Sequence, residues 1–336
     1  MEKLKPFNEK LTTAEMGKLW VTYTGNTMAT CVLSYYLNNV EDPEIKKVVE
    51  TALQLADTIV KDVKEILIAE NFPVPIGYTD EDVNLGAPRL FSDEFYLWYL
   101  KYTGKAGMSI YTIAIPLMTR KDIRELFTKI LKSTLDLESM VNQTLMDKGL
   151  YIEPPQIPTP EKVEMIQKQS FLHGFFGDIR PLHAMEITHL YDNIENNIAS
   201  KALLLGFSQV AKEDKIRKYF IRGKELTNNH IEKSTEKLHE SNLPSLKILD
   251  HLVSDSTIPP FSDKLMLAHK IEMFSMKIRT AGNGISLNGR RDIAKMYVSM
   301  LTDLGLYVED GFNIMIEHEW MEQPPLAINR DELTSN

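Results

Sequence analysis

Four side chains in the second half of the chain have the residue types of a metal centre: Glu195, His230, Glu272 and Glu309. Carboxylates and imidazoles that project from facing helices can hold two iron or manganese ions and leave coordination positions open for oxygen. Such a centre takes one glutamate from each of two helices and a Glu-x-x-His pair from each of the other two. The chemistry would be that of a metal-dependent oxidoreductase.

The spacing of these residues departs from that pattern. Thr227, rather than a glutamate, precedes His230 by three positions, and no histidine follows Glu309 by three. The apolar stripe of the helix that carries Glu272 bypasses this glutamate. We therefore expect no intact di-metal site, no catalytic residue and no cofactor, and we expect His230 to be buried and hydrogen bonded to its neighbours.

Composition excludes several other classes of protein. Cys31 is the only cysteine among 336 residues, which rules out an intrachain disulfide, a thiolate zinc site and a Cys-ligated iron–sulfur cluster. The net charge is −9, so nucleic acid and anionic membrane surfaces are not expected partners. No apolar run approaches the ~20 residues of a membrane span, and no secretory signal is evident. We expect a cytoplasmic protein.

An internal repeat organises the elements that carry these residues. The two halves match at an offset of 171 and, after a one-residue deletion, at an offset of 170: Leu19 with Leu190, Asn26 with Asn197, Phe91-Ser92-Asp93 with Phe261-Ser262-Asp263, and Arg120 with Arg290. Chance does not keep one register over so long a stretch. The pattern indicates duplication of one domain and excludes a solenoid of many short repeats.

Each half is predicted to form four helices. In the first half, apolar residues recur at helical spacing over residues 12–39, 42–71, 92–117 and 120–148. The connection over residues 71–90 is long and rich in proline and glycine, and one long crossover at this place is typical of ferritin-like bundles. The predicted fold is all-α, with two tandem ferritin-like four-helix bundles. They would comprise residues 1–150 and 182–336, joined by a proline-rich and aromatic linker over residues 151–181.

Two features allow more than one interpretation. The aromatic segment Phe171-Leu172-His173-Gly174-Phe175-Phe176-Gly177 is expected to dock between the bundles, and the alternative is a surface that binds a partner. Asn26 and Asn197 occupy equivalent inward-facing positions on the first helix of each half. A buried amide needs partners, so these residues either fix helix register or bind a small polar ligand.

Several motifs resemble one family. They are Gly149-Leu150-Tyr151 before Pro154-Pro155, the segment Lys201-Ala202-Leu203-Leu204-Leu205-Gly206-Phe207-Ser208-Gln209-Val210, Glu322-Gln323-Pro324-Pro325, and the repeated Phe-Ser-Asp. Nearly the whole chain resembles the family catalogued as domain of unknown function 3231, which is similar to ferritin-like spore coat proteins of the coat-F type. The resemblance implies a ferritin-like fold in each half, a connection with sporulation or the spore coat, and loss of the di-iron ligands. It carries over no catalytic residue.

Three functional hypotheses follow. The first is a non-enzymatic structural or assembly protein, spore associated, whose partner is a second copy of itself or another spore-associated protein. The second is a residual metal-dependent oxidoreductase in the second bundle, which analysis of bound metal would reveal. The third is a binder of a small hydrophobic molecule between helices, which would show as an apolar cavity too large for a packed core.

We predict that replacing His230 with isoleucine leaves the protein folded. The sister repeat has Ile59 at this position, so the site accepts a branched apolar side chain. Circular dichroism and thermal unfolding of His230→Ile would check this, and a large loss of stability would show that the imidazole itself is needed.

Overall fold

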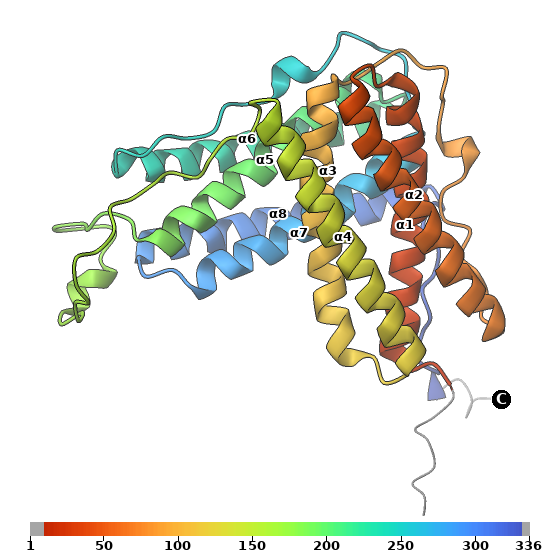
Figure 1. Ribbon diagram of the computed structural model, residues 1–336, viewed down its shortest axis with the longest axis horizontal. Coiled ribbons are helices and arrows are strands. Elements are labelled where there is room, and N and C mark those ends of the chain that lie inside the picture. Colours follow the sequence, from red (N-terminus) through yellow and green to blue (C-terminus); the bar gives the residue numbers. More distant parts are fainter. Residues whose placement is uncertain (1–9, 331–336) are drawn as a thin grey trace, which may run out of the picture.

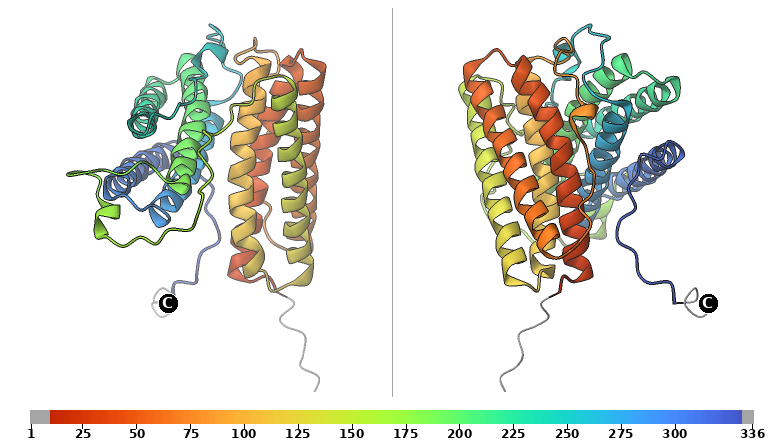
Figure 2. Two further views of the ribbon diagram at one scale, coloured as in Figure 1. Left: turned by 60° about the vertical axis from the view of Figure 1, so that its left-hand side comes forward. Right: turned by 90° about the vertical axis from the view of Figure 1, so that its right-hand side faces the viewer.

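The computed structural model describes residues 10–330, and the regular structure in this range is helical apart from two isolated β-bridges. The first bundle contains α1 (Thr13–Asn39), α2 (Pro43–Ala69), α3 (Asp93–Ala114) and α4 (Lys121–Asp147). The second contains α5 (Ala184–Val210), α6 (Asp214–Glu240), α7 (Asp263–Ser286) and α8 (Arg291–Glu317). The predicted all-α fold with two four-helix bundles is confirmed (Figure 1, Figure 2). No helix in the described range is long and apolar enough to cross a membrane.

Two buried glutamates fix the same end of each bundle. Glu15 in α1 and Glu186 in α5 each form a capping box with the residue three positions earlier. Each carboxylate also accepts a backbone hydrogen bond from the residue before the fourth helix, Arg120 at 2.8 Å and Arg290 at 3.0 Å. One side chain thereby joins the first helix to the fourth in both halves.

A long crossover connects the second and third helices in both bundles, as predicted. The Asp93 carboxylate accepts hydrogen bonds from the backbone N–H groups of Glu41 (3.2 Å) and Asp42 (2.7 Å). Because these residues precede α2, the start of α3 lies beside the start of α2. Residues 70–92 therefore return along the bundle. Asp263 makes the same contacts with the backbone that precedes α6.

The two crossovers pair with each other in an antiparallel sense. Val83 bridges Phe261, and Phe91 bridges Val253. Four backbone hydrogen bonds of 2.8–3.0 Å accompany these bridges: Asn84 N–H to Pro260 O, Ser254 N–H to Leu90 O, Ser92 N–H to Leu252 O, and Ser262 N–H to Asp82 O. Each contact has a counterpart with the equivalent residues exchanged. The halves are therefore related by an approximate twofold axis, as the subunits of a symmetric dimer are.

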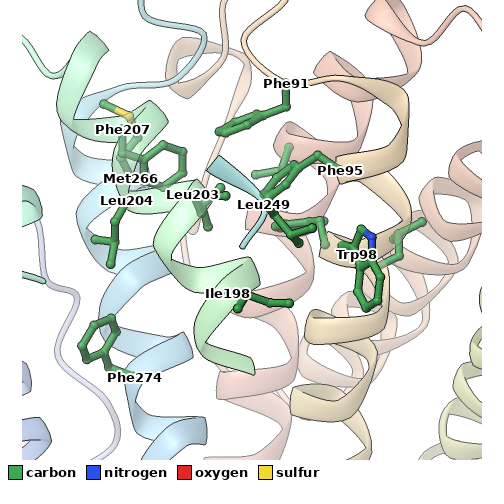
Figure 3. Close-up of a cluster of buried hydrophobic side chains, with 14 of the residues drawn as sticks. Phe91, Phe95, Trp98, Ile198, Leu203, Leu204, Phe207, Leu249, Met266 and Phe274 are labelled. Carbon is green, nitrogen blue, oxygen red and sulfur yellow. The ribbon is translucent and has the colours of Figure 1, made fainter. Parts of the chain in front are cut away.

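The contact between α3 and α7 lies near this axis. The Tyr99 hydroxyl and His269 Nε2 are 2.8 Å apart, and these two residues occupy the same position in the two repeats. Around them, one apolar core continues from one bundle into the other (Figure 3). Its labelled members from the first half are Phe91, Phe95 and Trp98, and those from α5 are Ile198, Leu203, Leu204 and Phe207.

The aromatic linker segment does not dock between the bundles, so that expectation was wrong. Phe176 is 86% exposed, and Phe175 is also exposed. Phe171 stacks on His183 and lies under Arg180, at the start of the second bundle. Gly174 lies against the Asp292 side chain at the start of α8, so the segment is held at the end of the second bundle and not at the interface.

We predict that Gly206→Ala destabilises the protein by about 1–3 kcal/mol, the usual range for an overpacked core. A Cβ at Gly206 of α5 would lie 2.6 Å from the Phe91 ring of the first half. Gly305→Ala on α8 is the matched control, since a Cβ there has no atom within 4 Å. Urea denaturation of both variants would check this, and equal midpoints would contradict the close packing at Gly206.

Candidate functional site

A cavity of about 520 Å³ lies between the first bundle and α7 and is partly open to solvent. Side chains from α1, α2, α3 and α7 form its walls, and residues after α8 close one side. The walls are mainly apolar, with contributions from Trp20, Met28, Leu55, Ile59, Leu100 and Ile110. A volume in the range of roughly 300–1,000 Å³ is usual for a ligand site and unusual for a packed helical core.

Glycines on two helices make the space. Gly104 and Gly107 of α3 line the cavity, and the equivalent positions of α7 hold Phe274 and Lys277, both buried inside the second bundle. Gly25 of α1 also lines the cavity, and Asn196 takes its place in the sister repeat. The second bundle therefore carries larger side chains at these three positions than the first does. Comparison of the two repeats at these positions is the sequence signal that could have revealed the cavity.

Glu272 is the prominent polar group of the cavity. Its side chain is exposed to the cavity, and its Oε2 would lie 3.8 Å from a Cβ placed on Gly25. It has no hydrogen bond or ion pair with any residue in the described range. Burial raises the pKa of Glu272 to about 7, against the opposing charge of Arg279. A carboxyl group with a pKa in this range takes up or releases a proton near neutral pH.

Two further polar groups of the cavity, Arg279 and Asn26, have partners. The Arg279 Nε donates to Ser109 Oγ at 3.1 Å. The amide of Asn26 donates to Thr22 O at 2.7 Å and lies 3.5 Å from the Tyr111 hydroxyl. Asn197, its equivalent in the second bundle, is buried away from the cavity and donates to Asn193 O at 2.7 Å. These hydrogen bonds agree with a structural role for both amides. Of the two, Asn26 faces a space where a ligand could bind.

The chain segment that follows α8 covers the cavity on the side of α1. Trp320, Met321 and Glu322 line the space. The Glu322 carboxylate accepts hydrogen bonds from the backbone N–H groups of Ile76 (2.9 Å) and Gly77 (2.7 Å) in the first crossover. The C-terminal segment of the second half is thereby attached to the first half, next to the opening.

The four metal candidates from the sequence occupy separate environments. Glu195 is buried between Lys101, at 2.6 Å, and Lys105. Burial raises its pKa, but the two ammonium groups outweigh this effect and hold the pKa below its usual range. Glu309 is exposed on α8, and Glu272 faces the cavity. Between residues 10 and 330, no three His, Cys, Asp or Glu side chains are grouped so that they could hold a metal.

His230 is buried in the second bundle, as predicted, but the expected hydrogen bond of its Nε2 is absent from the described residues. The nearest acidic atom is Asp303 Oδ2 at 3.9 Å. Burial, assisted by the charge of Lys277, lowers the pKa of His230 to about 3, so the ring is neutral. The position tolerates an unpaired nitrogen because its neighbours on α6 are themselves small and polar, with Thr227 and Ser234 both buried.

Sequence reasoning missed two buried lysines in α7. Lys270 donates to Ser200 Oγ at 2.8 Å, and Lys277 donates to Thr227 Oγ1 at 3.2 Å. Neither has a carboxylate partner among the described residues, and burial lowers the pKa of both amines well below the ordinary value. They fill the interior of the second bundle, where a di-metal site would otherwise be sought.

A family model matches the chain twice. The model described as Protein of unknown function (DUF3231) matches residues 1–163 and again residues 170–333. The chain belongs to this family. The two DUF3231 segments correspond to the two halves of the internal repeat, and the predicted family membership is confirmed.

Among solved structures, the chain is similar to one from Bacillus halodurans C-125 described as a "putative spore coat protein". The two share 18% identity with a TM-score of 0.42, and the match covers 46% of this chain and 100% of the other. A likeness at this level carries no argument about function. No protein of curated function matches the chain.

We predict that Glu272→Gln stabilises the protein more at pH 8 than at pH 5. The folded-state pKa of about 7 lies above the ordinary glutamate pKa of 4.5, so the folded protein holds this proton more tightly than the unfolded chain. Stability therefore falls as pH rises from about 4.5 through 7, and glutamine removes this loss. Thermal unfolding at both pH values would check it, with the exposed Glu309→Gln as control. An equal shift at pH 5 and pH 8 would contradict the raised pKa.

Proposed function

We propose that this protein binds a small, largely apolar molecule in the cavity between the first bundle and α7. The observation that carries the proposal is the cavity of about 520 Å³ in the place where the sister bundle is filled by Phe274 and Lys277. The apolar walls of this partly open cavity are in contact with water, and a ligand with apolar surface would remove them from water.

The composition of the walls supports an apolar ligand. Helices α1 and α2 contribute aliphatic and aromatic side chains, and α3 contributes Leu100 and Ile110 beside its two glycines. A few polar groups, Glu272, Arg279 and Asn26, lie among them. Mostly apolar walls with a small number of placed polar groups are the usual composition of small-molecule sites.

Assembly with other proteins is a second candidate function, and the linker favours it. Apolar side chains of this segment are exposed, among them Val163 (93%), Met165 and Phe176. Exposed apolar groups concentrated on one segment often mark a contact surface. The partner would be a second copy of this chain or a spore-associated protein. A location in the cytoplasm, followed by incorporation into the spore, is compatible with both candidate functions. A non-enzymatic role remains part of this proposal.

The metal-dependent alternative lacks a geometric basis in the described residues. Glu195 is already paired with two lysines, Glu309 faces solvent, and His230 and Glu272 lie in different spaces. We therefore do not propose an oxidoreductase.

We predict that the protein binds the uncharged apolar dye N-phenyl-1-naphthylamine at one saturable site and that Gly25→Leu weakens binding by about tenfold or more, which is about 1.4 kcal/mol. A Cβ at Gly25 meets one atom outside its own helix turn within 4 Å, Glu272 Oε2 at 3.8 Å, so the added side chain begins at the cavity wall without a clash. The enhancement of dye fluorescence on titration measures binding.

Gly305→Leu provides the matched control for this titration. It adds the same side chain at an exposed helical glycine with no atom within 4 Å of the new Cβ. The proposal requires that this variant bind like the parent protein. If the parent does not bind the dye saturably, or if both leucine variants bind equally well, the cavity is not a binding site.

A further inference from the structure

We propose that the ligand of this cavity carries a protonated amine on an apolar body and that the carboxylate of Glu272 recognises the amine. This inference rests on the proposed function, because it names the chemical class of molecule that the cavity would take. It depends on one unpartnered carboxylate, the groups that surround it, and the place of both in the repeat.

Glu272 lacks a partner in the described part of the chain. The side chain faces the cavity and has no hydrogen bond or ion pair with any residue between 10 and 330. A carboxylate that lines a largely apolar cavity and has no protein partner is stabilised in its charged form when a cation or a hydrogen-bond donor binds beside it. An ammonium group supplies both, since it carries the opposite charge and up to three N–H donors.

The cations of the cavity are engaged elsewhere. Arg279 lies seven residues after Glu272 on α7, which is roughly 10 Å along a helix, and its Nε is bound to Ser109. Lys264 donates to Gly77 O at 3.3 Å and stands 5.1 Å from the centre of the Tyr78 ring. Neither cation forms an ion pair with Glu272 within 4 Å. Arg279 acts on Glu272 only at longer range, where its charge partly offsets the rise in the pKa of the carboxyl, so the carboxylate oxygens remain available to a ligand cation.

The carboxylate has aromatic surroundings. Tyr78, Tyr99 and Tyr111 all line the cavity. Burial raises the pKa of each phenol, and the nearby charge of Glu272 adds to that shift in all three. Lys264 already lies over the Tyr78 ring, so this part of the cavity wall accommodates a cation beside aromatic and apolar groups.

Glu272 differs from its equivalent in the sister repeat. The equivalent residue of α3 is Tyr102, which is buried at the interface with α7 and donates to Met273 O at 3.4 Å. A carboxylate is therefore present at this position of α7 and absent at the equivalent position of α3. Ser275 and Ile271, which flank Glu272 on the cavity wall, replace the Lys105 and Lys101 of the other half. The lysines that would neutralise a carboxylate here are missing.

Three probes with one alkyl chain and different head groups test the inference. Isothermal titration calorimetry at pH 8 would compare octan-1-amine, octan-1-ol and octanoate. We expect octan-1-amine to bind about tenfold or more tightly than octan-1-ol, and octanoate to bind weakest. Glu272→Gln should weaken octan-1-amine binding by about tenfold and change octan-1-ol binding by less than about twofold. Tenfold corresponds to about 1.4 kcal/mol.

The control for these titrations is Glu309→Gln, which removes the same charge from an exposed position on α8 and should leave all three affinities unchanged. Equal binding of octan-1-amine to the parent and to Glu272→Gln would overturn the inference. Tighter binding of octanoate, lost in Arg279→Gln, would also overturn it and would indicate an acidic ligand held by the guanidinium. In both cases, retained binding of octan-1-ol and of the uncharged dye would leave the proposed function standing. Loss of the amine preference is therefore distinct from failure of the cavity to bind.

Discussion

Helices α3 and α7 cross near the approximate twofold axis, and this crossing sets the position of one bundle relative to the other. Tyr99 and His269 meet there from equivalent positions, and the paired crossovers fix the two bundles on either side. Beside this crossing, Glu195 of α5 is paired with Lys101 and Lys105 of α3. Both partners of the Lys101 pair are buried, so removal of Glu195 would leave the Lys101 ammonium without its carboxylate at a cost of about 3–5 kcal/mol. The two halves are therefore held as one body, and a space between them keeps its shape.

The cavity is a consequence of broken symmetry at this interface. On one side of the axis the interface contains Glu195 with its two lysines. On the other side the equivalents of these three residues are Thr24, Ile271 and Ser275, and all three line the cavity. Small or uncharged side chains replace a buried ionic group there, and glycines of α1 and α3 widen the space. The repeat has two equivalent places at this interface, one filled by the ionic group and one that is open.

The sequence predicted the parts of the fold that depend on local patterns. Apolar spacing located the eight helices, the Phe-Ser-Asp motifs located the starts of α3 and α7, and the proline- and glycine-rich stretch located the long crossover. The cavity was missed because it depends on which face α7 presents to the other bundle, and helical spacing within one half carries no such information. The sequence placed Glu272 outside the apolar stripe of its helix. The cause lies in the packing of the two halves, because the residue faces the first bundle. The exposed Phe176 was misjudged because an aromatic side chain alone does not reveal whether an interface has room for it.

The two halves enclose an open space bounded by Gly25, Gly107 and Glu272. A crystal structure of the protein, purified without detergent, is the direct test of this space. We expect it to be open, with Glu272 directed into it and the Glu322 carboxylate bound to the backbone of Ile76 and Gly77. Aromatic side chains such as Trp20 or Tyr111 packed there, so that no volume is left between α1, α3 and α7, would show that no such space exists.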